Sequence, residues 1–191
     1  MTTHISLGGT CAIAYQLNKH NKRENAYPFD WSKTDITQLI TVLEQDFTDY
    51  EDVEIKKLSD NHPNNETGFA SYILINKYKI TMAHEISDVK EIAEFREKLI
   101  RRIDRFKKIE GKIIFYRLET CVYKKNYDDK INKLINILDS YKIDYELRMI
   151  VHKSYKESYI NLMDNKIKLY YYDKMTPDWK FDNIDWIQIF K

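Results

Sequence analysis

Apolar side chains recur at helical spacing in several segments of the chain. Ile13 and Leu17 share one face of residues 12–19, and Asp35 with Gln38 forms a capping-box pattern at the start of an apolar-faced segment. The longest such segment carries a dense set of charges on its opposite face. The spacing predicts helices over residues 12–19, 35–46, 88–108 and 127–138.

Other segments have the composition of strands. Residues 112–118 contain four successive apolar or aromatic residues, a pattern typical of a strand covered on both faces. Residues 4–7, 145–151 and 166–172 are further candidates, and residues 70–82 predict a hairpin around Asn76-Lys77. The polar residues 48–68 predict a long surface loop.

The order of these elements predicts an α/β fold. Strands and helices alternate, which favours a three-layer, Rossmann-like domain with a mostly parallel central sheet and the hairpin added at its edge. The pattern shows no repeat and no linker, so a single domain over residues 1–191 is expected. The aromatic-rich tail at residues 178–190 is expected to dock on the rest.

Charge and cysteine content restrict the classes of function. Lys plus Arg number 31 and Asp plus Glu number 30, so nothing global predicts binding to nucleic acid or a membrane. The basic run within residues 101–108 is interpreted as the solvated face of the long helix. Two cysteines, Cys11 and Cys121, and the lack of a signal-peptide pattern favour free thiols in the cytoplasm, the host cytoplasm for a viral chain. The sequence leaves the oligomeric state open.

Cys11 is the first candidate for chemistry. It follows the Gly8-Gly9 turn, where a strand is expected to pass into a helix. Free N–H groups and the helix dipole at that position would favour a thiolate and lower the pKa of the thiol. The alternative is that Cys11 is a small buried apolar residue.

Further candidates follow the other strands, because sites in parallel sheets gather at the carboxyl ends of the strands. Arg117 and Glu119 end one strand, His152 ends another, and His84 follows an apolar stretch. An imidazole near the thiol would supply a base. His152 is also consistent with an ordinary exposed turn.

The segment AYPFDW at residues 26–31 is a second cluster. Pro28 restricts its own backbone and that of Tyr27, so the segment is expected to be rigid and non-helical. Asp30 between Phe29 and Trp31 would either accept hydrogen bonds from buried N–H groups or orient His84 or a substrate.

Several familiar sites are excluded by their spacing. Leu17 occupies the arginine position of a C-x5-R phosphate loop, and neither G-x-G-x-x-G nor G-x-x-x-x-G-K-[ST] occurs. The cysteines and histidines have no zinc-binding spacing. No metal and no cofactor are therefore expected.

The pair S-L-G-x-x-C at residues 6–11 and P-F-D-W at 28–31 resembles a domain family of unknown function from bacteria and large DNA viruses, labelled "putative papain-like cysteine peptidase". His84-Glu85, Arg102-x-x-Arg105-Phe106 and the strand ending at Arg117 extend the resemblance to about residue 120. The family usually has aspartate where Glu85 stands. The resemblance implies that Cys11 is a nucleophile and His84 its base.

The leading hypothesis is thus a cysteine hydrolase or peptidase acting on a peptide or small molecule. Its candidate catalytic residues are Cys11, His84, Asp30 and Glu119, and its candidate substrate-binding residues are Gly8, Gly9, Thr10, Arg117 and Trp31. One rival is a Rossmann-type, glycosyltransferase-like enzyme whose SLGG turn and Arg117 bind the phosphates of a sugar nucleotide. Another is a non-enzymatic interaction module that uses the tail from Trp179 to Phe190.

Overall fold

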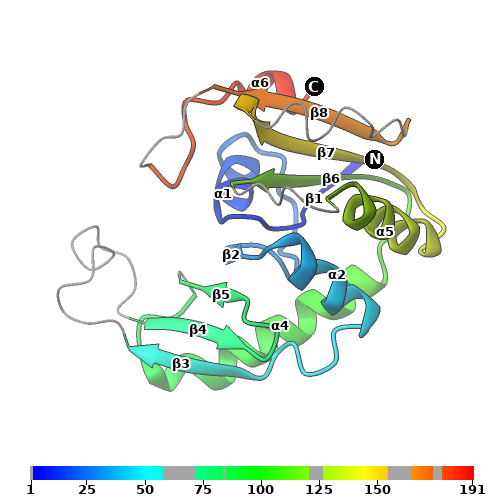
Figure 1. Ribbon diagram of the computed structural model, residues 1–191. Coiled ribbons are helices and arrows are strands. Elements are labelled where there is room, and N and C mark those ends of the chain that lie inside the picture. Colours follow the sequence, from blue (N-terminus) through cyan, green and yellow to red (C-terminus); the bar gives the residue numbers. More distant parts are fainter. Residues whose placement is uncertain (1, 58–71, 84, 121–126, 155–164, 174–177) are drawn as a thin grey trace.

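The structure is a computed structural model that describes residues 2–57, 72–83, 85–120, 127–154, 165–173 and 178–191. It contains two four-stranded sheets stacked in one molecule, with helices around them (Figure 1). The chain is therefore a mixed α/β protein, as the element pattern predicts. No described helix is long and apolar enough to cross a membrane.

The first sheet is entirely parallel, with strand order β1-β6-β7-β8. Its strands are β1 (Thr2–Ser6), β6 (Lys112–Glu119), β7 (Asp144–His152) and β8 (Ile167–Tyr172). Seven successive residues of β6 are buried, which confirms that this strand is covered on both faces. All four carboxyl ends meet at one edge of the sheet, where candidate residues were expected.

The second sheet is antiparallel, with strand order β2-β5-β4-β3. Its strands are β2 (Ser32–Lys33), β3 (Val53–Lys57), β4 (Tyr72–Asn76) and β5 (Thr81–Met82). The predicted hairpin exists as β4 and β5, but its expected place at the edge of the parallel sheet is wrong. Instead, β4 pairs with β3 and β5 pairs with β2, both in the antiparallel direction.

The loop prediction for residues 48–68 is also partly wrong. Val53–Lys57 form edge strand β3, in which buried Val53 and half-buried Ile55 alternate with exposed Glu54 and Lys56. Such alternation marks a strand with one solvated face, and the surrounding charges obscure it in the sequence. Residues 58–68 lie outside the described part of the chain.

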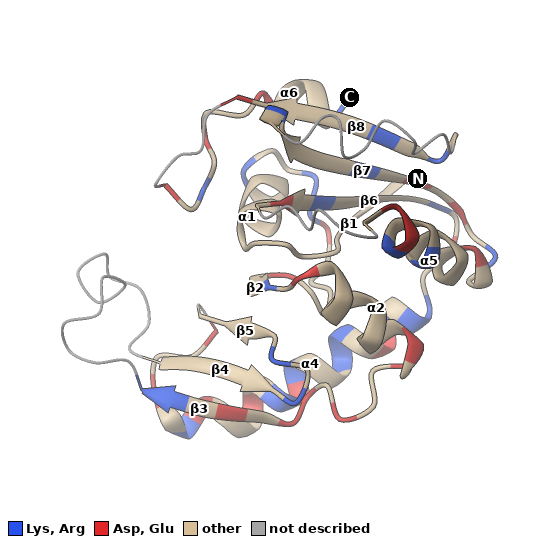
Figure 2. Cartoon of the chain, viewed as in Figure 1, with Lys and Arg blue, Asp and Glu red and all other residues tan. Residues whose placement is uncertain are grey.

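The helices match the sequence pattern closely. They are α1 (Ala12–Lys19), α2 (Ile36–Glu44), the 3-10 turn η1 (Val89–Glu91), α4 (Ile92–Lys107), α5 (Tyr127–Ser140) and the short α6 (Trp186–Ile189). The Asp35–Gln38 capping box is present, with the Asp35 carboxylate accepting from the Gln38 N–H and the Gln38 side chain accepting from the Asp35 N–H. Figure 2 shows Lys, Arg, Asp and Glu interspersed along α4.

Two apolar clusters form the core. The larger one joins the antiparallel sheet, α2, α4 and α5 to one face of the parallel sheet. The smaller one covers the opposite face, where α1 and the chain after β8 pack on β6 and β7. The prediction that the tail docks is confirmed, since Trp186, Ile189 and Phe190 are buried there. Those three side chains are therefore not available as the external contact surface that the interaction-module hypothesis assigned to them.

The predicted solvated face of α4 needs one correction. Arg101, Lys107 and Lys108 are exposed, but Arg102 is buried and Arg105 is half-buried. Both of these point inward because they have polar partners there: Arg102 pairs with Glu85, and Arg105 donates to the Ala26 carbonyl.

Candidate active site

The Gly8-Gly9 turn delivers Cys11 to the start of α1. Both glycines have positive φ, at 76° and 90°, a region that side chains disfavour. A Cβ on Gly9 would lie 1.9 Å from the Leu118 carbonyl oxygen, so the turn presses directly on β6. A Cβ on Gly8 would lie 3.1 Å from Thr34. Only glycine permits both close approaches.

Cys11 occupies the N-cap position of α1, is partly exposed and is unpaired with any other cysteine in the described chain. Its helix-terminal place confirms the sequence prediction. However, burial raises the pKa of the Cys11 thiol to about 11, which a contact from its own backbone N–H only partly opposes. The expected low pKa is therefore not found: desolvation outweighs the helix terminus, and the resting sulfur is a neutral thiol.

Arg117 and Glu119 lie beneath this turn rather than beside a solvent-filled site. The Arg117 guanidinium is fully buried, donates to the Leu7 and Thr34 carbonyl oxygens at 3.0 Å each, and pairs with the Glu119 carboxylate. Arg117, which was expected to bind substrate, thus joins the residue after β1 to the residue after β2, and the Glu119 carboxylate balances its charge.

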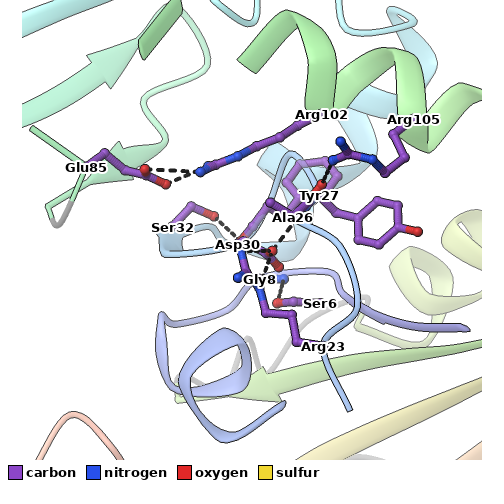
Figure 3. Close-up of polar contacts among 11 residues, drawn as sticks. Ser6, Gly8, Arg23, Ala26, Tyr27, Asp30, Ser32, Glu85, Arg102 and Arg105 are labelled. Carbon is purple, nitrogen blue, oxygen red and sulfur yellow. Dashed lines mark hydrogen bonds and ion pairs between the residues drawn. The ribbon is translucent and has the colours of Figure 1, made fainter. Parts of the chain in front are cut away.

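Asp30 is also buried, within the turn that precedes β2. Its carboxylate accepts from the Tyr27 N–H at 3.0 Å and pairs with Arg23 at 2.9 Å (Figure 3). Burial raises the pKa of Asp30 while Arg23 opposes that shift. Asp30 thus satisfies a buried N–H and fixes the turn, which is one of the two roles that the sequence left open.

Hydroxyl groups connect this turn to the glycines. The Ser32 hydroxyl donates to the Phe29 carbonyl and lies 2.7 Å from the Thr34 hydroxyl, and Gly8 packs on both side chains. The Gly8 N–H donates to the Ser6 hydroxyl at 3.1 Å, so it is already occupied. Gly8 therefore contributes packing, and a substrate would have to use the N–H groups that follow it.

Arg102 of α4 forms a further buried ion pair in this part of the molecule. Its guanidinium donates to both Glu85 oxygens, at 2.5 and 3.1 Å, and both side chains are more than nine-tenths buried (Figure 3). The neighbouring Arg105 donates to the Ala26 carbonyl. Sequence reasoning missed these inward roles, although the R-x-x-R-F spacing places both arginines on one helical face.

The imidazoles are distributed over several places. His84, the expected base, lies outside the described residues, as does Cys121. His152 ends β7 and lies 2.7 Å from the Ser154 hydroxyl and 2.9 Å from the Asp173 carbonyl oxygen. His4 contacts the Tyr116 hydroxyl, and burial lowers the pKa of His4 to about 4. Within the described part of the chain, no group of three His, Cys, Asp or Glu residues has the geometry of a metal site.

The chain is similar in sequence to known proteins. A family model described as "Putative papain-like cysteine peptidase" matches residues 2–155. An uncharacterized protein of Acanthamoeba polyphaga mimivirus is 29% identical over 217 aligned positions, which cover 98% of this chain and 96% of the viral protein. No solved structure matches the chain significantly.

Proposed function

Because the chain belongs to the family described as "putative papain-like cysteine peptidase", we propose that it is a cysteine hydrolase, and specifically a peptidase, with Cys11 as its nucleophile. The observation that carries the proposal is the position of Cys11. It is partly exposed at the N-terminus of α1, at the carboxyl edge of the parallel sheet, and follows a turn that two glycines press onto β6.

The high pKa of Cys11 decides how the nucleophile would act. A neutral thiol requires a base that takes its proton as sulfur attacks the carbonyl carbon. We assign this role to His84. The imidazolium then protonates the leaving amine as the C–N bond breaks, and a water deprotonated by the same imidazole hydrolyses the resulting thioester.

Two features support His84 as the base. It follows β5 by two residues in the sequence, and the family resemblance implies a histidine followed by an acid at this point of the chain. The following residue, Glu85, forms a buried ion pair with Arg102.

The backbone beside Cys11 supplies the proposed oxyanion site. The Ala12 N–H donates to the Thr10 hydroxyl, whereas the Gly9 and Thr10 N–H groups have no acceptor among the described residues. A well-placed donor contributes about 3 kcal/mol to the stabilisation of a tetrahedral intermediate.

We also propose the Rossmann-like, three-layer arrangement for the parallel sheet and its helices, since α1 with the tail covers one face of the sheet and α5 covers the other.

The sugar-nucleotide alternative loses its main support. Arg117 was to bind the donor phosphates, but its guanidinium is fully buried and pairs with Glu119 and two carbonyl oxygens. No described feature favours that reaction over thiol chemistry.

Alkylation of Cys11 tests the proposal. In a Cys121→Ser background, iodoacetamide is expected to label Cys11 at pH 7.5 about 10²-fold faster in the chain with His84 than in the His84→Ala variant, since a general base commonly contributes a factor of that size. The matched control His152→Ala should label as fast as its parent. In the His84→Ala variant, the rate should rise with pH towards about 11. Identical pH profiles with and without His84 would overturn the assigned base.

Activity supplies the second test. Hydrolysis of activated esters or peptides should disappear in Cys11→Ala and in His84→Ala, and persist in His152→Ala. Turnover that survives Cys11→Ala would overturn the nucleophile.

A further inference from the structure

Three partly exposed aromatic side chains from distant segments meet near the start of α1. Tyr15 lies on α1, Trp31 ends the 26–31 turn, and Trp179 belongs to the tail. The Trp179 ring lies 5.2 Å from the Tyr15 ring, at 66°, and 6.5 Å from the Trp31 ring, at 57°. We call Tyr15, Trp31 and Trp179 the aromatic platform.

The platform begins one helical turn after the proposed nucleophile. The Tyr15 N–H donates to the Cys11 carbonyl oxygen at 3.2 Å, so the backbone of the two residues is directly joined. Residues four positions apart lie on the same side of a helix, so an acyl group at Cys11 would have its neighbouring groups on the side of α1 that carries Tyr15.

The fold holds Trp179 in this place with a dedicated polar contact. Gln16 is fully buried on α1, and its amide nitrogen donates to the Lys180 carbonyl at 2.8 Å and to the Asp182 carboxylate at 2.7 Å. Lys19 also pairs with Asp182, at 2.8 Å. Burying an amide costs free energy unless it is hydrogen-bonded. The buried Gln16 side chain is therefore stabilised by these bonds, and it anchors the residues after Trp179 to α1.

The backbone of Trp31 holds its side chain in a defined place. Its φ is +59°, a left-handed conformation that is unusual for a bulky side chain, and seven other non-glycine residues of the described chain share it. Such a conformation persists only where the surrounding structure imposes it. Because Trp31 is only partly buried, core packing does not account for the choice of tryptophan there.

Cations surround the platform. The Lys180 ammonium lies 5.6 Å from the Tyr15 ring centre and 5.9 Å from that of Trp179, and the Arg23 guanidinium lies 6.0 Å from that of Trp31. Arg23 is neutralised by Asp30, as Lys19 is by Asp182. Lys180 lies close to the Asp182 carboxylate, and its backbone N–H donates to the Asp178 carboxylate, so the charges around the platform are balanced.

We infer that the aromatic platform is a specificity subsite that receives a flat apolar side chain beside the scissile acyl group. The inference rests on the proposed function and deepens it by naming the substrate class. Trp179 lies outside the residues 2–155 that the family model matches, so this part of the subsite is an addition to the family region.

Hydrolysis of N-acetylated amino-acid p-nitrophenyl esters tests the subsite. We expect kcat/KM to be at least tenfold higher for the phenylalanine ester than for the alanine ester. Trp179→Ala and Trp31→Ala should each reduce that ratio to about two by raising KM for the phenylalanine ester, and leave the alanine ester within about twofold. Ile187→Ala, an exposed position of the same tail, is the matched control.

The two proposals fail in different ways. Ester turnover that depends on Cys11 but shows no preference for phenylalanine would overturn the subsite and leave the hydrolase intact. Turnover that does not depend on Cys11 would overturn the hydrolase. In that case the subsite is tested by a binding measurement, in which N-acetyl-phenylalanine amide is titrated into the protein and tryptophan fluorescence is followed. Saturable binding that Trp179→Ala weakens at least fivefold would support the subsite, and lack of such binding would overturn it.

Discussion

Two irregular segments pack on the parallel sheet, and they are held by different combinations of forces. The tail is anchored mainly by apolar side chains, with Trp186, Ile189 and Phe190 buried against α1, β6 and β7. The 26–31 turn buries the Phe29 ring against Phe47, Tyr50 and Phe106, but it is held in addition by a set of directed polar contacts. In addition to Asp30 with its partners, the Tyr50 hydroxyl donates to the Pro28 carbonyl at 2.9 Å.

The difference follows from what each segment must do. Apolar burial is non-directional, so it can fix a segment to a sheet without specifying each backbone atom. Hydrogen bonds and ion pairs are directional, and buried ones are costly to leave unmade. The 26–31 turn lies close to Gly8 and to the strand before Cys11. There the positions of individual backbone groups determine where Cys11 is placed. Even in the tail, the buried polar anchors Gln16 and Arg148 end on backbone carbonyls, those of Lys180 and Ile189.

The largest effect is expected at the Gly8-Gly9 turn, against which the 26–31 segment and its following residues are held. Gly9→Ala places a methyl group on the Leu118 carbonyl oxygen at a φ of +90°, so we expect little folded protein, a loss above about 4 kcal/mol. Gly111→Ala is the matched control, because its φ is +78° but nothing lies within 4 Å of the added Cβ. It should cost about 1 kcal/mol. Urea unfolding measures both, and equal losses would contradict the close contact with β6.

The tail offers the next largest effect. Trp186→Ala removes a side chain that is 3% exposed, and we expect a loss of about 4 kcal/mol in the free energy of unfolding. The adjacent Ile187 is 62% exposed, so Ile187→Ala should change stability by less than about 0.5 kcal/mol. A small loss for Trp186→Ala would show that apolar burial is not what holds the tail.

The arginines of α4 test the polar region behind the turn. Arg102→Met leaves the Glu85 carboxylate buried without its partner, and we expect a loss of about 3 kcal/mol. Arg101→Met on the next position breaks only a 3.8 Å surface pair with Glu97 and should cost less than about 0.5 kcal/mol. Similar values for the two variants would show that the buried pair of Arg102 with Glu85 contributes no more to stability than a surface pair.

The elements with strong local signals were predicted well. The period of apolar residues located α1, α2, α4 and α5, and the capping box at Asp35 marked the start of α2 within one residue. The continuous apolar run of β6 correctly predicted a strand buried on both faces. These signals depend on a few neighbouring residues, so the sequence contains them completely.

Pairing partners and burial were not predictable in the same way. The hairpin β4–β5 was recognised, but whether it extended the parallel sheet or joined β2 and β3 depends on residues far away in the chain. The same holds for the two buried arginines. Arg102 pairs with Glu85, which lies 17 positions away in the sequence, and Arg117 donates to the carbonyl of Thr34, which lies 83 positions away.

The sequence by itself determined that a cysteine follows a glycine turn at the start of a helix, and that P-F-D-W marks a rigid turn, because these are properties of short segments. Only the tertiary structure decided that burial raises the pKa of the Cys11 thiol, that Arg117 lies beneath the turn, and that Trp179 meets Tyr15 and Trp31. Desolvation and ring contacts arise from the sum of distant neighbours, which no local pattern records.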